Sequence, residues 1–141
     1  MKENNNIKSY TLKLLKKKNY YIIELYEKLK KKYEVEEVNR IIKECILLEI
    51  LNDKLLVEMK TYYLLYVKKY GKKYIINYFI NKHISYNLIL HILAKYNDDL
   101  FLNNMNQLIK ELKIKNKSNI FIYNYLLRKG YEEEDIKKYV S

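Results

Sequence analysis

Apolar residues recur at intervals of three and four along almost the whole chain, which is the spacing of one face of an α-helix. The pattern predicts nine successive helices and no convincing strand, although residues 119–127 have the propensity of a strand. The expected helices cover residues 7–18, 20–32, 35–50, 52–71, 72–84, 86–96, 98–114, 118–129 and 132–140.

Residues that break helices are scarce, because the chain has no proline and only two glycines. Turns must therefore be few, or built from Asn, Asp and Ser. We expect Gly71 to end a helix, and Asp53, Asp98 and Asp99 to cap helix starts. The fold class predicted from these features is all-α.

Three stretches of the sequence align without gaps: residues 28–42, 79–93 and 126–140. Each is predicted to be the corner between the second and third helices of a three-helix unit, although amphipathic helix pairs can also align by chance. Gly130, His83 and Lys32 align at the corner, where the αL conformation is expected. The expected packing positions are Leu29, Tyr33, Val38, Ile42, Ile80, Ile84, Ile89, Leu93, Leu127, Tyr131, Ile136 and Val140.

The offset of about 50 residues between these corners is typical of a helical repeat array. We therefore predict a flexible N-terminal tail over residues 1–6 and three repeats over residues 7–51, 52–97 and 98–141. Three such units would form an elongated, curved array.

Three phrases resemble a known family. The third corner reads LLRKGYEEEDI, the second repeat opens with ILNDKLLVEM, and a basic stretch with a central glycine, VKKYGKKYII, follows. In these phrases the sequence resembles the RecX family of RecA regulators, over about residues 12–140. The chain departs from the family in several places: Asn52 replaces an acid, and Lys largely replaces Arg.

The resemblance implies three tandem three-helix repeats and a regulatory, non-enzymatic role without a cofactor. Proteins of this family bind the RecA filament on single-stranded DNA and restrain its ATPase, strand exchange and co-protease activity. The implied setting is homologous recombination, DNA repair and the SOS response. The single cysteine, and the lack of a stretch like a signal peptide or a membrane span, predict a cytoplasmic protein, which we expect to be a monomer.

The net charge of +11, from 28 Lys and Arg against 17 Asp and Glu, favours an anionic partner. Lys, Asn, Ile and Tyr dominate the composition, so codon bias is an alternative source of the lysine excess. Residues 52–97 are the most basic of the three predicted repeats.

Lys68, Lys69, Lys72 and Lys73 are the leading candidates for contact with phosphates or an acidic partner. Two further runs could extend the same face. They are Lys16, Lys17 and Lys18, and Lys30, Lys31 and Lys32. For all three groups, an ordinary solvated surface is the alternative.

Tyrosines interleave with the basic stretch and suggest either base stacking or, as we favour, packing against the core. They are Tyr62, Tyr63, Tyr66, Tyr70, Tyr74 and Tyr78. Cys45 lies on an apolar face and is expected to be a buried thiol. His83 and His91 lack partners at zinc spacing, and no phosphate-binding glycine loop is present.

The acids Glu132, Glu133, Glu134 and Asp135 are expected to stabilise the start of the last helix, or to contact a basic partner. No run is long and apolar enough to suggest a membrane span or a signal peptide. Two alternatives to a RecX-like function remain open at this stage. They are a sequence-tolerant DNA-binding module acting without RecA, and a helical scaffold for protein partners.

Overall fold

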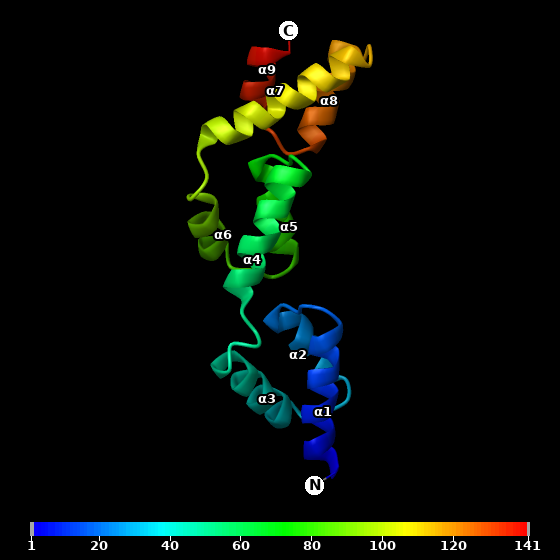
Figure 1. The fold of residues 1–141 in the computed structure, drawn as a ribbon, viewed down its shortest axis with the longest axis vertical. Helices are drawn as coiled ribbons and strands as arrows, with labels where there is room; N and C mark the ends of the chain where they lie inside the picture. Colours follow the sequence, from blue (N-terminus) through cyan, green and yellow to red (C-terminus); the bar gives the residue numbers. More distant parts are fainter. Residues whose placement is uncertain (1, 141) are drawn as a thin grey trace. The chain divides into compact units, whose positions relative to one another are not determined.

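The computed structural model describes residues 2–140, and the side chains of residues 7–140 (Figure 1). Its helices are α1 (Lys2–Lys17), α2 (Ile22–Lys30), α3 (Val35–Leu47), α4 (Asp53–Tyr62), α5 (Lys72–Asn81), α6 (Tyr86–Leu93), α7 (Asp98–Ile114), α8 (Asn119–Arg128) and α9 (Glu133–Tyr139). A π-helical turn, η1 (Tyr63–Val67), continues directly from α4. No strand occurs in residues 2–140, so the predicted all-α class is confirmed.

The chain divides into two compact units, Met1–Leu56 and Val57–Ser141. α4 passes from the first unit to the second, and the second contains α5 to α9. α1 begins at Lys2, five residues before the predicted start at Ile7. The tail predicted over residues 1–6 lies outside the side chains that the structure describes. Its flexibility and the three repeat boundaries stay predictions.

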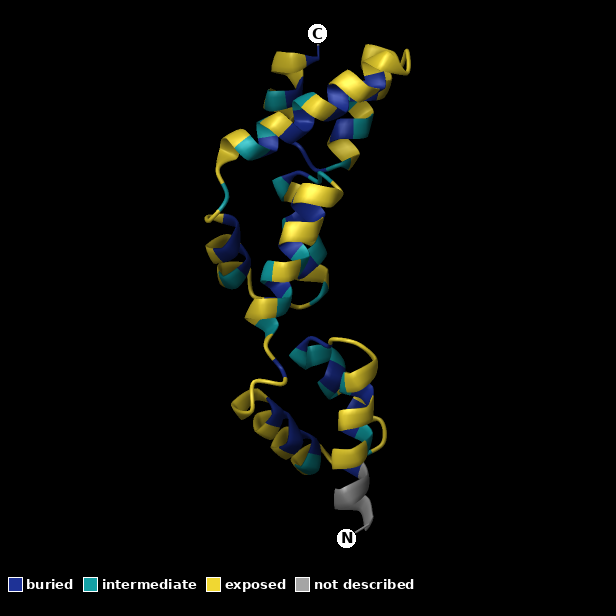
Figure 2. Ribbon diagram, in the orientation of Figure 1, coloured by how far each residue is buried: buried dark blue, intermediate teal, exposed yellow. Residues whose placement is uncertain are grey.

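The first unit has a core in which α3 packs against α1 and α2. Leu25, Leu29 and Val38 are completely buried there, together with the nearly buried Ile7 and Leu51. Figure 2 shows buried segments, in dark blue, along the helices of this unit. The buried residues of α2 (Leu25 and Leu29) and of α3 (Val38, Ile41, Ile42 and Cys45) recur at helical spacing, so one face of each of these helices removes its apolar surface from water.

A long-range hydrogen bond also joins elements of the first unit. The N–H of Ile22, at the start of α2, donates to Asp53 Oδ1 at 2.9 Å. Asn52 takes the expected capping place in α4, where its Oδ1 accepts from the Leu55 N–H at 3.1 Å. The side chain of Asp53 therefore bonds the start of α2, and Asn52 rather than Asp53 is the cap of α4.

The core of the second unit is formed by residues from α4, η1 and α5 to α9, with α5 packed against α6, and α8 packed against α7 and α9. Leu65, Phe79, Met105, Leu126 and Ile136 are completely buried. The side chain of Asn104, 6% exposed, donates from Nδ2 to the Leu65 carbonyl at 2.9 Å. A carbonyl inside the π-helical turn is thus paired by a side chain from α7.

The corners show where the ungapped alignment fails. Of the twelve expected packing positions, Ile80 and Leu127 are 44% and 38% exposed, so the prediction is wrong for these two. Tyr33 is half-buried, and the other nine are buried. Phe79 and Leu126, one residue earlier, are completely buried in place of Ile80 and Leu127.

An extra left-handed residue explains the shift. His83 has φ 62° and Gly130 has φ 95°, whereas Lys32 has no positive φ, contrary to the prediction. The N–H of Tyr131 donates to the carbonyl of Leu126 at 3.2 Å, five residues back, but that of Tyr33 donates to Leu29, four residues back. The second and third corners therefore end in a Schellman-type turn, which moves the buried position back by one residue.

Candidate functional site

The second unit contains a close crossing of two backbone segments at the only two glycines of the sequence. The N–H of Gly71, before α5, donates to the Lys129 carbonyl at 2.7 Å, and the N–H of Lys73 donates to that of Gly130 at 3.2 Å. A Cβ on Gly71 would lie 2.3 Å from the Gly130 oxygen, and one on Gly130 would lie 2.4 Å from the Tyr74 nitrogen. Only glycine permits this approach.

Gly71 thus has a different role from the predicted one. Its φ of −80° and ψ of 170° are ordinary extended values, and it is the N-cap of α5. The left-handed residue after η1 is Lys69, with φ 56°. Glycine is needed at position 71 for contact with Gly130, not for the turn.

Two side chains from the third corner bind the carbonyls that follow η1. The hydroxyl of Tyr131, 5% exposed, donates to the Lys69 carbonyl at 2.5 Å. Lys129 Nζ donates to the Lys68 carbonyl at 2.7 Å. Burial, and then the neighbouring Tyr125, raise the pKa of Tyr131. These contacts satisfy carbonyls that a helix end leaves unpaired.

Three of the four leading lysine candidates form ion pairs with acids of the third predicted repeat. Lys72 binds Asp98, at the start of α7, and Lys73 binds Glu132, before α9, at 3.2 Å. Lys69 approaches Glu111 of α7 at 3.9 Å. Their charges are therefore used within the unit, which sequence spacing alone did not indicate.

At the start of α7 the expected caps are wrong, whereas the acids of α9 lie where they were expected. Asn97, not Asp98 or Asp99, is the N-cap of α7, and its side chain accepts from the Asp99 N–H at 3.0 Å. Glu133 accepts from the hydroxyl of Tyr123 at 2.8 Å and pairs with Lys137 at 3.1 Å. The Tyr123 hydrogen bond, followed by Lys137, lowers the pKa of Glu133. Glu133, Glu134 and Asp135 lie in the first turn of α9, as expected.

Lys68, the fourth candidate, lies near Lys60 and Lys129, which were not among the predicted contact residues. Burial, and then the charges of Lys68 and Lys69, lower the pKa of Lys129. Lys60 and Lys68 both lie over the ring of Tyr63, at 5.0 and 5.9 Å from its centroid. Positive groups that crowd one another in this way favour an anionic partner.

These cations alternate with aromatic rings, and we call the whole set the lysine–aromatic surface. Its lysines and rings are Lys60, Tyr63, Lys68, Tyr70, Tyr74, Tyr78, Lys82, Lys117, Phe121, Tyr125 and Lys129. They come from α4 and η1, from α5 with the residues before and after it, and from α8 with the residues before and after it (Figure 1).

At the centre of this surface two tyrosine rings stack. The centroids of Tyr70 and Tyr74 are 3.6 Å apart with 5° between the ring planes, and Lys129 lies 4.3 Å from the Tyr70 ring centroid. The hydrogen bond with Tyr70 raises the pKa of Tyr74, while the charges of Lys60 and Lys68 act in the opposite direction. Both ammonium groups are thus close to the stacked pair.

On α8 the same arrangement repeats at a spacing of four residues. Lys117 lies 4.8 Å from the Phe121 centroid, and the Phe121 and Tyr125 rings are 6.4 Å apart with 19° between their planes. Lys129 then lies 5.8 Å from the Tyr125 centroid. Residues four apart are neighbours on a helix, so these groups form one ridge.

The tyrosines around the basic stretch do not form the core that we favoured. Tyr62, Tyr63 and Tyr66 are 59%, 40% and 42% exposed, and Tyr70, Tyr74 and Tyr78 are half-buried. The core-packing interpretation is therefore wrong for the first three. The buried stripe of α4 and η1 consists of Val57, Thr61, Leu64 and Leu65 at helical spacing, and the three tyrosines lie outside it.

The two other lysine runs lie in the first unit. Lys16, Lys17 and Lys18 are exposed, and Lys18 Nζ lies 4.5 Å from the Tyr20 ring centroid. Lys30, Lys31 and Lys32 are also exposed. Lys30 pairs with Glu27 at 3.1 Å, and Lys32 lies over the ring of Tyr10 at 4.3 Å. A role for these runs in binding stays a prediction.

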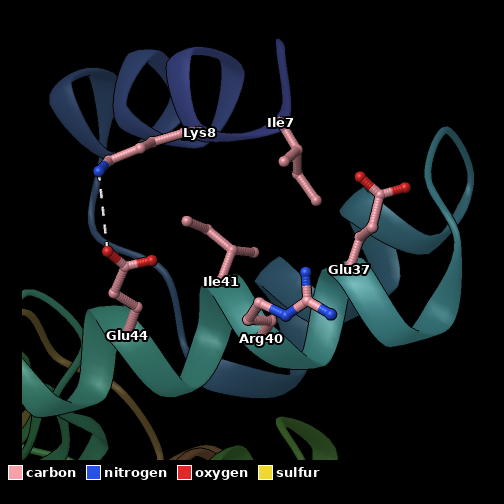
Figure 3. A pocket seen from close by; sticks show the side chains of 6 residues that line it. All are labelled: Ile7, Lys8, Glu37, Arg40, Ile41 and Glu44. Atoms are coloured by element: carbon pink, nitrogen blue, oxygen red, sulfur yellow. Dashed lines mark ion pairs between the residues drawn. The ribbon is translucent and has the colours of Figure 1, made fainter. Parts of the chain in front are cut away.

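A hollow of about 190 Å³ lies between α1 and α3 in the first unit (Figure 3). Lys8 pairs with Glu44 across it at 3.7 Å, and Arg40 and Glu37 project from α3 beside it. Glu37 Oε2 is buried and accepts no hydrogen bond from any described residue. Two acids and two bases balance here, so the hollow has no preferred sign for a charged ligand.

The remaining chemical candidates lie apart from these surfaces. Cys45 is 3% exposed in the core of the first unit, and burial, then Glu44, raise the pKa of its thiol. His83 and His91 are exposed. Within the described part of the chain, no three His, Cys, Asp or Glu side chains are grouped as metal ligands. No helix there has the length and apolar character to cross a bilayer.

No family model matches the sequence, and no curated protein matches it either. The fold, in contrast, matches solved structures. The crystal structure of RecX from Lactobacillus salivarius superposes with a TM-score of 0.81 and 23% identity, covering 92% of this chain and 89% of that chain. A crystal structure of a regulatory protein RecX gives the same TM-score with 16% identity, covering 97% and 70%. The chain therefore has the fold seen in these RecX structures.

Proposed function

We propose that this protein is a RecX-like regulator, which binds the filament that RecA forms on single-stranded DNA and inhibits its activities. The main support is the likeness to two RecX structures, which extends over 92% and 97% of this chain. A likeness of fold alone does not define a function, so the surface chemistry must also fit.

The surface that fits this partner is the lysine–aromatic surface of the second unit. Lys60, Lys68 and Lys129 gather there, and within the described residues none of them pairs with a carboxylate. Unpaired cations suit a partner that presents DNA phosphates or an acidic protein face. Regulation then follows from binding along the filament, by a monomer acting in the cytoplasm.

The test uses the cognate RecA with single-stranded DNA. Adding the protein in stoichiometric amounts should lower the DNA-dependent ATPase rate and the cleavage of a LexA-type repressor. The protein should also sediment with the filament. An unchanged ATPase rate together with no co-sedimentation would exclude this function.

A matched pair of variants links the effect to the surface. Lys68→Glu should weaken co-sedimentation, because Lys68 is exposed and pairs with no carboxylate among the described residues. Lys110→Glu serves as the control for a general loss of positive charge, because Lys110 is exposed on α7 and is not one of the lysines of the lysine–aromatic surface. Equal losses in both variants would contradict the assignment of the surface.

A further inference from the structure

We propose that the lysine–aromatic surface is a binding site for single-stranded nucleic acid, in which unpaired bases stack on its rings. This inference goes beyond the proposed function, because it requires direct contact with the strand and no RecA. It rests on the geometry of the second unit alone.

The first observation concerns the availability of the charges. Lys69, Lys72, Lys73 and Lys95 in the second unit all pair with carboxylates. Within residues 57–140, by contrast, Lys60, Lys68 and Lys117 contact rings rather than acids, and Lys129 contacts rings and a carbonyl. A phosphate that approaches these four lysines meets no competing carboxylate partner.

The second observation concerns the rings. Tyr63 and Phe121 are 40% and 39% exposed, and Tyr74 and Tyr125 are half-buried. An apolar ring held at a surface beside cations offers a face to a base, since every base has a π-face. Two separate ridges, on α5 and α8, therefore provide stacking positions.

The lysines that now cover these rings are suited to exchange with a base. A cation–π contact at an exposed site is weaker than the stacking of a base on an aromatic ring. When a base occupies the ring, the displaced ammonium group can bind the adjoining phosphate. In the free protein, each ammonium group therefore already lies close to the expected position of a phosphate of the bound strand.

The same geometry selects single strands over other polyanions. In a duplex the base faces are stacked on one another, so a duplex could use the lysines but not the rings. An acidic protein surface would likewise use the charges alone. The proposal therefore commits to a strand with unpaired bases, either DNA or RNA.

The test measures fluorescence anisotropy of a labelled oligothymidylate titrated with the full-length protein, without RecA. Three further probes are an oligouridylate, a hairpin duplex and an abasic strand of equal length. Tyr63→Leu and Phe121→Leu should each weaken oligothymidylate binding by at least about five-fold. Both substitutions should leave the abasic strand, which keeps the phosphates but has no bases, unaffected.

The charge variant, unlike the ring variants, should not distinguish the strand with bases from the abasic strand. Lys60→Gln combined with Lys68→Gln should weaken binding of the oligothymidylate and the abasic strand alike. It should also lower the salt slope by roughly 0.7 for each phosphate that the variant no longer neutralises. Lys110→Gln, as the control, should change the affinity and the slope much less.

Tyr86→Leu is the matched ring control, because Tyr86 is 53% exposed on α6 and belongs to no aromatic pair among the described residues. Circular dichroism should show that all variants keep their helical content. Equal affinity of the wild type for oligothymidylate and abasic strand would overturn the proposal, as would unchanged binding in the Tyr63 and Phe121 variants. Loss of strand binding with a retained effect on the RecA ATPase would separate this site from the proposed function.

Discussion

Two groups of lysines in the second unit have the same charge but different neighbours. Lys69, Lys72 and Lys73 each meet an acid from α7 or from the segment before α9. Lys60, Lys68 and Lys129 meet aromatic rings and one another. A lysine run in a sequence can therefore contain both structural and available charges, and only the fold separates them.

Substitutions at the Gly71–Gly130 crossing should lower the stability of the protein more than any other change proposed below. Gly71→Ala and Gly130→Ala should each lower the free energy of unfolding by about 2–5 kcal/mol, because a Cβ at either position overlaps backbone atoms. Urea denaturation followed by circular dichroism measures this loss.

A second substitution separates the two causes at position 130. Asn tolerates a positive φ better than Ala does, so Gly130→Asn relieves the conformational strain but keeps the overlap with Tyr74. A loss as large as that of Gly130→Ala would show that close contact dominates. Near-wild-type stability of both variants would mean that the crossing is not formed as described.

The second largest effect should be on filament binding, where substitutions in the two lysine groups should give different losses. Lys60→Gln with Lys68→Gln should weaken co-sedimentation with RecA filaments about ten-fold, or about 1.4 kcal/mol. Lys72→Gln with Lys73→Gln should change it much less, since these charges are already paired with Asp98 and Glu132. The reverse order would break the distinction between available and structural lysines.

Tyr131 should make the stability of the folded protein depend on pH in the alkaline range. Burial raises the pKa of Tyr131 above its ordinary value of 10.0, so the folded protein holds this proton more tightly than the unfolded chain. Its contribution to stability is complete below about pH 10 and falls as the pH rises further, as the unfolded phenol ionises.

Tyr131→Phe should therefore reduce the alkaline loss of stability. At neutral pH it should cost about 1 kcal/mol, because the hydrogen bond to the Lys69 carbonyl is removed. Urea titrations at neutral and alkaline pH measure both effects. Tyr86→Phe on the exposed face of α6 is the control at neutral pH, and an equal change there would point to a general effect of losing a phenol.

The ion pairs should give the smallest change in stability. Lys72→Gln and Lys73→Gln should each lower the free energy of unfolding by no more than about 1 kcal/mol, because both pairs are partly exposed to solvent. The loss should shrink further at high salt. A larger, salt-independent loss would show that these pairs contribute more to the unit than their exposure suggests.

The sequence predicted the helices well, because their apolar spacing is regular and breakers are few. It did not predict the one-residue shift at Phe79 and Leu126. That shift depends on a left-handed residue which His83 accepts and Lys32 does not. The side chains of His83 and Lys32 do not by themselves explain why the second corner has a left-handed residue and the first has none. The conformation of each corner is set by packing.

The candidate site was only partly visible in the sequence. The spacing of four that joins Lys117, Phe121, Tyr125 and Lys129 can be read directly from the chain. The pairing of Lys72 with Asp98 could not be predicted, because it depends on how distant helices approach one another. For the same reason, the contact between the two glycines was not predicted.

Because of the glycine crossing, hydrogen exchange at two amide groups can report how cooperatively the second unit unfolds. The N–H groups of Gly71 and Lys73 donate to carbonyls of Lys129 and Gly130, which lie far away along the chain. They can exchange with solvent only when the third corner separates from the start of α5. Exchange at these two sites therefore measures whether the second unit opens as one body or in parts.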